Sequence, residues 1–103
     1  MIQQGDVILE SVKQVEGNAC KSRDGFYVLA EGESTGHMHK TQAVAGVEFY
    51  EKDGMFYLVN KTGHDVEIQH EEHKTVYVPD GVWKVRKVRE YDHFAEEARD
   101  VAD

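Results

Sequence analysis

The stretch "VEFYEKDGMFYLV", residues 47–59, contains two runs of β-branched and aromatic residues on either side of Asp53-Gly54. An Asp-Gly pair suits a type I′ turn, in which both central residues adopt positive φ. Val, Phe and Tyr are common in strands because they fit a pleated, half-buried surface. The stretch therefore predicts a β-hairpin.

The same alternation of turn signals and β-prone runs continues through most of the chain. Nine glycines separate short runs rich in Val, Tyr, Phe and Ile, a spacing typical of all-β domains. Further strands are expected within residues 6–15, 25–31, 64–70, 74–81 and 82–91. We predict an all-β fold, a small curled sheet, barrel or sandwich of about seven or eight short strands.

The last twelve residues break this pattern. Phe94, Ala98 and Val101 recur at helical spacing behind Asp92, a suitable N-cap, so residues 92–103 predict a short C-terminal α-helix.

On the strands, apolar residues at positions two apart predict one buried sheet face. The expected core residues are Phe26, Val28, Phe49, Phe56, Leu58, Val76, Val78 and Val85.

Length, charge and cysteine content limit the class of protein. A chain of 103 residues predicts a single domain over residues 1–103. Twenty acidic residues against twelve basic ones give a net charge of −8, which disfavours general nucleic-acid binding and attraction to anionic membranes. The single cysteine, Cys20, excludes an internal disulfide, and no segment resembles a signal peptide or a membrane span. We therefore expect a cytoplasmic protein.

The segment "GHMH", residues 36–39, is the first candidate for a functional site. On a strand, His37 and His39 point to one face and Met38 to the other. Two imidazoles side by side suit a divalent metal ion, with zinc as the leading candidate and nickel or manganese as others. The alternative is a pair of solvated histidines on an acidic protein.

A third ligand is expected from "HEEH", residues 70–73. On a regular strand His70 and His73 face opposite sides, so either one of them joins His37 and His39, or a bulge or turn at Glu71-Glu72 directs both to the same side. Glu72 or Glu71 could then act as general base toward a metal-bound water. The structural alternative is a charged edge that keeps the sheet from pairing with a neighbouring molecule.

A second cluster, "WKVRK" at residues 83–87, is basic in an otherwise acidic chain. Lys84 and Arg86 are candidates to receive a small anionic substrate, with Trp83 as an apolar wall. The alternative is that these cations pair with the acidic residues of the C-terminal segment.

Two family resemblances are carried by these motifs. "PDGVWK" and the His-x-His pair partly resemble the cupins, although Lys84 stands where their last histidine ligand is expected and the glutamate beyond His39 is missing. The sequence more closely resembles a family of small uncharacterised bacterial and phage proteins, through "GDV", "LAEGESTGHMH", "HEEH", "PDG" and "REY". That resemblance implies a shared sequence pattern but no substrate. The positions of this chain that belong to the pattern are Thr35, Gly36, His37, His39, His70, Glu71, Glu72 and His73.

Two classes of function follow. The first is a metal-binding β protein, which could be a metal-dependent hydrolase acting on an anionic substrate. The second is a non-catalytic binding or assembly module, a homo-oligomer whose His/Glu motifs form an interface.

Overall fold

The computed structural model describes residues 1–32 and 34–88. These residues form ten β-strands, more than expected because several strands have only two or three residues. The predicted helix over 92–103 lies outside the described residues. The strands are β1 (Ile2–Gln4), β2 (Val7–Val12), β3 (Asn18–Ala19), β4 (Phe26–Glu31), β5 (Met38–Gln42), β6 (Val47–Lys52), β7 (Met55–Asn60), β8 (Val66–Ile68), β9 (Val76–Val78) and β10 (Gly81–Lys87).

The β6–β7 hairpin forms as the sequence predicts. Lys52 pairs with Met55 across the turn, and Asp53 and Gly54 both have positive φ, 51° and 81°. Asp24-Gly25 makes a similar turn, with φ values of 52° and 82°, just before β4. In both places the turn chemistry of the sequence determines where a strand begins.

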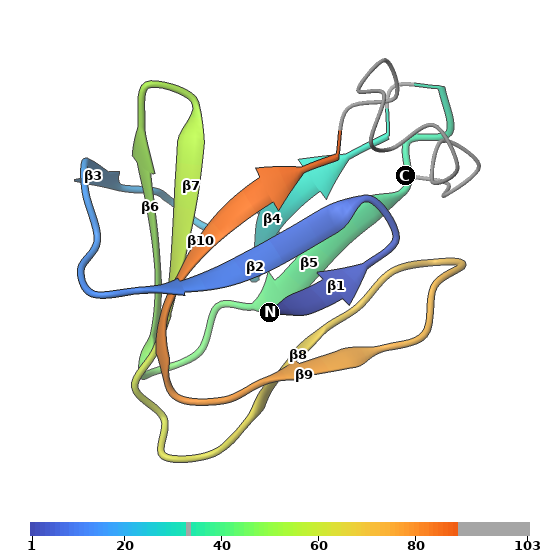
Figure 1. Cartoon of the computed structure of the whole chain (residues 1–103). Helices are drawn as coiled ribbons and strands as arrows, with labels where there is room; N and C mark the ends of the chain where they lie inside the picture. The colour runs from blue at the N-terminus through green and yellow to red at the C-terminus, as the bar shows by residue number, and fades with distance from the viewer. Residues whose placement is uncertain (33, 89–103) are drawn as a thin grey trace.

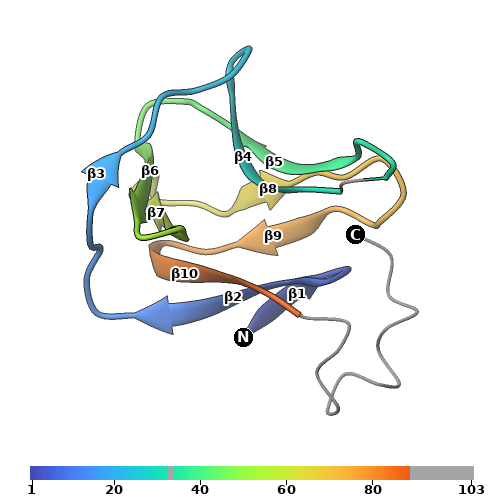
Figure 2. The same ribbon diagram turned by 90° about the horizontal axis from the view of Figure 1, so that it is seen from above.

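The strands are arranged in two layers (Figures 1 and 2). One layer is a six-stranded sheet in the order β1-β2-β10-β7-β6-β3. The other contains the β4–β5 and β8–β9 hairpins, which are joined by two hydrogen bonds between the backbones of Lys40 and Gln69. The all-β prediction is confirmed for the described residues, which do not form a closed barrel. No helix among these residues is long and apolar enough to cross a membrane.

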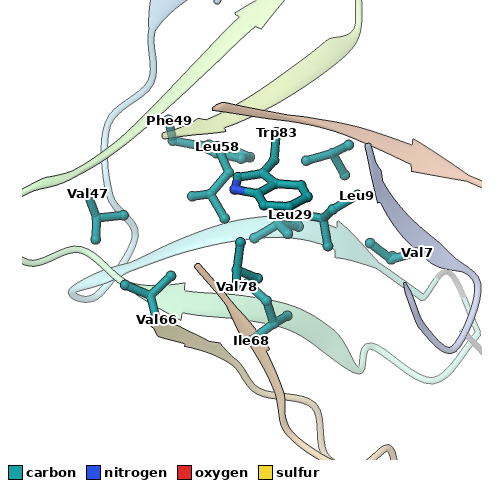
Figure 3. Packing of buried hydrophobic residues seen from close by; sticks show 11 residues of the cluster. Val7, Leu9, Leu29, Val47, Phe49, Leu58, Val66, Ile68, Val78 and Trp83 are labelled. Atoms are coloured by element: carbon teal, nitrogen blue, oxygen red, sulfur yellow. The ribbon is translucent and has the colours of Figure 1, made fainter. Parts of the chain in front are cut away.

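The core lies between the two layers (Figure 3). Phe49, Leu58, Val78 and Val85 are buried as predicted, whereas Phe26, Val28, Phe56 and Val76 remain partly exposed. A register shift between Val28 and Ala30 explains the error on β4. Such a bulge changes the phase of the alternation, and Leu29 is buried in place of Val28. Other members of the buried core cluster that the sequence analysis did not include are Val7, Leu9, Val47, Val66, Ile68 and Trp83.

Candidate metal site

His39 lies at the centre of the candidate site. On β5, His39 and Thr41 are buried, whereas Met38 and Lys40 on the opposite face are partly exposed. The His39 side chain is 0% exposed. His39 therefore lies in the interior and not at an exposed rim of the sheet, so its replacement should also affect folding. Met38 does face the opposite way, but it is not a core residue: its sulfur lies 4.0 Å from Nη2 of Arg23, in an exposed contact.

Gln4 on β1 determines the orientation of the His39 ring. The Nε2 group of Gln4 donates hydrogen bonds to the carbonyl oxygens of Ile68 (2.8 Å) and Lys74 (2.9 Å). Because the amide nitrogen is committed to these acceptors, Oε1 of Gln4 faces Nδ1 of His39 at 2.8 Å. Oε1 can only accept, so Nδ1 carries a proton and, in the neutral ring, Nε2 keeps its lone pair. Nε2 is therefore the nitrogen of the ring with acceptor character.

The carboxylate of Asp6 lies close to this nitrogen. Its Oδ1 lies 3.4 Å from Nε2 of His39, and its Oδ2 lies 3.7 Å from Nζ of Lys87. Two ligand atoms bound to one tetrahedral Zn²⁺ are roughly 3.4 Å apart, given bonds of about 2.1 Å. The Asp6 carboxylate thus lies beside His39, a contact that the sequence analysis did not predict. The signal was weak: one aspartate after Gly5, in the turn between β1 and β2.

The loop after β8 brings both histidines of "HEEH" to the site. Residues 71–73 bend, which corresponds to the second of the two alternatives left open by the sequence. The centroid of the His39 ring lies 4.3 Å from that of His70 and 5.8 Å from that of His73. The His70 ring also lies 4.5 Å from His73 and 5.5 Å from His37. Imidazoles that share one Zn²⁺ have centroids roughly 5 Å apart, so these separations are on the scale of a metal site.

His70 is oriented by its own loop. Its Nδ1 accepts hydrogen bonds from the backbone N–H groups of Glu72 (3.0 Å) and His73 (3.2 Å). The ring therefore closes the turn at Glu71-Glu72, in the manner of a side chain that replaces a backbone acceptor.

The two glutamates of the motif have different surroundings. Glu71 accepts a hydrogen bond from the backbone N–H of Met38 at 3.0 Å, and this bond holds the pKa of the Glu71 carboxyl below its usual value. Glu72 lies with Oε1 3.7 Å from Nδ1 of His37 and is largely exposed. A carboxylate beside the second nitrogen of a histidine is a common support for a metal ligand. Glu71 therefore ties the loop to β5, and Glu72 is the carboxylate that accompanies His37.

Lys84 and Arg86 of β10 do not lie at this site. Trp83 and Val85 point into the core, so Lys84 and Arg86 project from the opposite face of the six-stranded sheet. Arg86 pairs with Glu10 on β2. Trp83 is not a wall of a binding site; it is buried, and its indole N–H donates to the carbonyl of Pro79. Lys87, at the end of β10, lies beside the histidine cluster through its contact with Asp6.

A preformed metal centre is not present among residues 1–32 and 34–88. No three His, Cys, Asp or Glu side chains there meet the geometric requirements of a bound ion. Side chains of the cluster would have to rotate to coordinate one.

Comparison with known proteins assigns the chain to a family. A family model described as a domain of unknown function (DUF8820) matches residues 3–88. The chain belongs to this family. The match includes every residue placed in the cluster above, and it carries no assigned activity. No curated protein and no solved structure matches the chain.

Proposed function

We propose that this member of the DUF8820 family binds a divalent cation, with zinc the first candidate, at the cluster formed by His37, His39, His73 and Asp6. The observation that carries the proposal is the fixed orientation of His39. Gln4 occupies Nδ1 and leaves Nε2 directed at a carboxylate oxygen 3.4 Å away. A hydrogen bond from the second ring nitrogen is what orients histidine ligands in known metal sites.

Burial and charge support the same proposal. His39 and Asp6 are buried, and a cation beside them would offset the cost of burying the Asp6 carboxylate. The donors come from three separate segments: the β1–β2 turn, the segment that leads into and includes the start of β5, and the 70–73 loop. An ion bound by these donors would join the two layers of the sandwich, so binding should also stabilise the fold.

The proposed activity is binding and not hydrolysis. The hydrolase hypothesis requires Lys84 and Arg86 beside the ion, to receive an anionic substrate. Both residues instead lie on the outer face of the six-stranded sheet. Glu71 is committed to the Met38 N–H, and Glu72 lies 3.7 Å from Nδ1 of His37, so we do not expect either glutamate to act as a general base.

Metal analysis of untagged protein by mass spectrometry tests the proposal. We expect one equivalent of zinc, nickel or manganese after purification or reconstitution, and retention of that equivalent in His64→Ala. His64 is a matched control because it is exposed and its Nδ1 lies 3.0 Å from the carbonyl of Asp65. Less than a tenth of an equivalent after reconstitution with each of the three ions would refute metal binding and favour the alternative of a metal-free binding or assembly module.

A further inference from the structure

A cavity of about 310 Å³ lies between β4, the β6–β7 hairpin and the segment over residues 20–23, and no histidine lines it. The chain that contains this segment crosses from β3 in one layer to β4 in the other (Figure 2). Ligand pockets in proteins have volumes of about 300 to 1,000 Å³. A water molecule occupies about 30 Å³ of liquid, so the cavity has room for a small molecule of at least about ten non-hydrogen atoms.

One wall of the cavity is aromatic. The rings of Tyr27, Phe49 and Phe56 form a continuous stack, with centroids 5.6 Å and 5.1 Å apart and interplanar angles of 25° and 6°. Phe56 ends this stack, remains partly exposed and lines the cavity together with Phe49. Aromatic groups prefer offset-stacked or edge-to-face contacts with centroids about 4.5 to 7 Å apart. The wall therefore favours a planar aromatic group in the cavity.

The opposite wall is formed by the bulge on β4. Val28 pairs with Lys40 and Ala30 pairs with His39, so Leu29 is the extra residue between them. Val28, Leu29 and Ala30 all line the cavity. Bulges are common beside binding sites because they redirect side chains and end the regular pairing. This wall adds aliphatic surface to the aromatic surface across from it.

The segment over residues 20–23 is fixed at both ends by backbone hydrogen bonds. The N–H of Cys20 donates to the carbonyl of Phe49 at 2.8 Å. Arg23 and Phe26 exchange two bonds of 2.7 Å and 2.9 Å across the Asp24-Gly25 turn. The backbone positions of the side chains that this segment presents to the cavity are therefore determined before any ligand binds, which lowers the entropic cost of binding.

The rim of the cavity has a positive charge in an acidic protein. Lys21 and Arg23 are exposed and line it with one carboxylate, Glu31, which leaves a charge of +1 in a chain of net charge −8. Nη1 of Arg23 lies 3.6 Å from Oε1 of Glu31, and Lys21 forms no ion pair within residues 1–32 and 34–88. Because the Arg23–Glu31 pair is exposed, it is weak, and an incoming anion can compete for the guanidinium.

We propose that this cavity binds a small aromatic carboxylate, with its ring against Phe56 and its carboxylate at Lys21 and Arg23. A monoanion complements the charge of the rim, and the planar guanidinium matches a carboxylate in geometry. This inference goes beyond the proposed metal binding and does not depend on it, since none of the residues assigned to the ion lines the cavity.

Phenylacetate is a probe of suitable size, and two compounds with the same number of non-hydrogen atoms are its controls. Phenylacetamide keeps the ring without the charge, and octanoate keeps the charge without the ring. In ¹H–¹⁵N NMR titrations of the unmodified protein, phenylacetate should shift the amide signals of residues 20–23, 28–31 and 56 with a Kd of about 1 mM or below. Both controls should bind at least about fivefold more weakly.

Three results of these titrations would overturn the proposal. The first is the absence of a saturable shift up to about 20 mM phenylacetate. The second is equal binding of either control compound. The third is a set of shifts at the cavity residues on dilution of the protein alone, without a response to phenylacetate, because it would identify a second copy of the chain as the occupant.

Arg23→Gln tests the role of the rim charge. It should weaken phenylacetate binding by about tenfold and leave the weaker binding of phenylacetamide unchanged. Lys61→Gln is the matched control, since Lys61 is also an exposed cation paired with a glutamate, 3.3 Å from Glu48, and does not line the cavity. Equal loss of affinity in the two variants, or no loss in Arg23→Gln, would contradict recognition of the carboxylate at this rim.

Cys20 provides a measurement that needs no substitution. It is the single cysteine of the chain, it is partly exposed, and it lines the cavity. Saturating phenylacetate should slow the reaction of its thiol with iodoacetamide by at least about threefold, because a bound ligand limits access to the sulfur. An unchanged rate in protein saturated with phenylacetate would place the binding site elsewhere and overturn the proposal.

Discussion

The β6–β7 hairpin and the histidine cluster are specified in different ways. In the hairpin, each residue pairs with one at most thirteen positions away along the chain, and Asp53-Gly54 sets the register. In the cluster, Gln4 contacts His39 across 35 positions and Ile68 across 64. The hairpin is formed by pairs of residues close together in the sequence, whereas the cluster is formed by contacts between segments that are far apart in the sequence. Changes to the hairpin should therefore alter stability with little effect on the site, whereas changes to the cluster should alter both.

The largest expected effect comes from Leu58→Ala on β7. Leu58 is fully buried in the core, and truncating such a residue costs about 2 to 5 kcal/mol in unfolding free energy through lost burial and the resulting cavity. Urea denaturation followed by circular dichroism measures the change. The protein that remains folded should keep its metal stoichiometry; a loss of metal from that folded protein would show that the core and the site are not separable.

His39→Ala should affect stability and binding together. It removes the partner of a buried Gln4 oxygen, and a buried polar group left unsatisfied costs about 1 to 3 kcal/mol. It should also abolish binding of the proposed ion, measured by calorimetric titration of the refolded variant with Zn²⁺. His64→Ala, at an exposed position, should change the unfolding free energy by less than about 0.5 kcal/mol. An unchanged unfolding free energy in His39→Ala would contradict the structural role of the Gln4–His39 bond.

The contrast between the regions explains what the sequence could and could not predict. The hairpin, the Asp24-Gly25 turn and the all-β class depend on neighbouring residues, so they could be predicted from sequence patterns. The residues of "GHMH" and "HEEH" were recognisable by type and spacing. Gln4, Asp6 and Lys87 were not, because their role depends on the packing of β1 and the end of β10 near β5, which no local pattern encodes. The bulge on β4 reversed the expected burial of Val28 and Leu29 for a similar reason.

Gly54→Ala tests the local part of the comparison. An added Cβ at Gly54 would meet no atom within 4 Å, so only the positive φ of 81° opposes the substitution. A non-glycine residue in this left-handed conformation costs about 1 to 2 kcal/mol, which a shift in the urea midpoint would measure. Zinc affinity should be unchanged within error. A change in affinity would mean that the hairpin and the cluster are coupled.

Glu71→Gln should give the smallest effect, visible as a pH dependence of the metal-free protein. The pKa of Glu71 is lowered in the folded state, chiefly by the Met38 N–H, so its ionised form stabilises the fold above its ordinary pKa of 4.5. That contribution is lost as the pH falls through the lowered value. The melting temperature of the unmodified protein should exceed that of Glu71→Gln at pH 7, and the gap should narrow below pH 4.5.

The exposed Glu67→Gln on β8 serves as the control for this measurement. A gap between Glu71→Gln and the unmodified protein that stayed constant from pH 7 to pH 3 would exclude an electrostatic origin.

The two hydrogen bonds between Lys40 and Gln69 have a consequence for amide hydrogen exchange. Lys40 follows His39 in the chain and Gln69 precedes His70, so the bonds that join the two hairpins lie directly beside the histidine cluster. The two N–H groups exchange with deuterated solvent only when this junction opens, and the opening free energy can be far below that of global unfolding. Their exchange rates therefore report how often the β4–β5 and β8–β9 hairpins separate, and a ligand that bridges His39 and the 70–73 loop should slow both rates by the same factor.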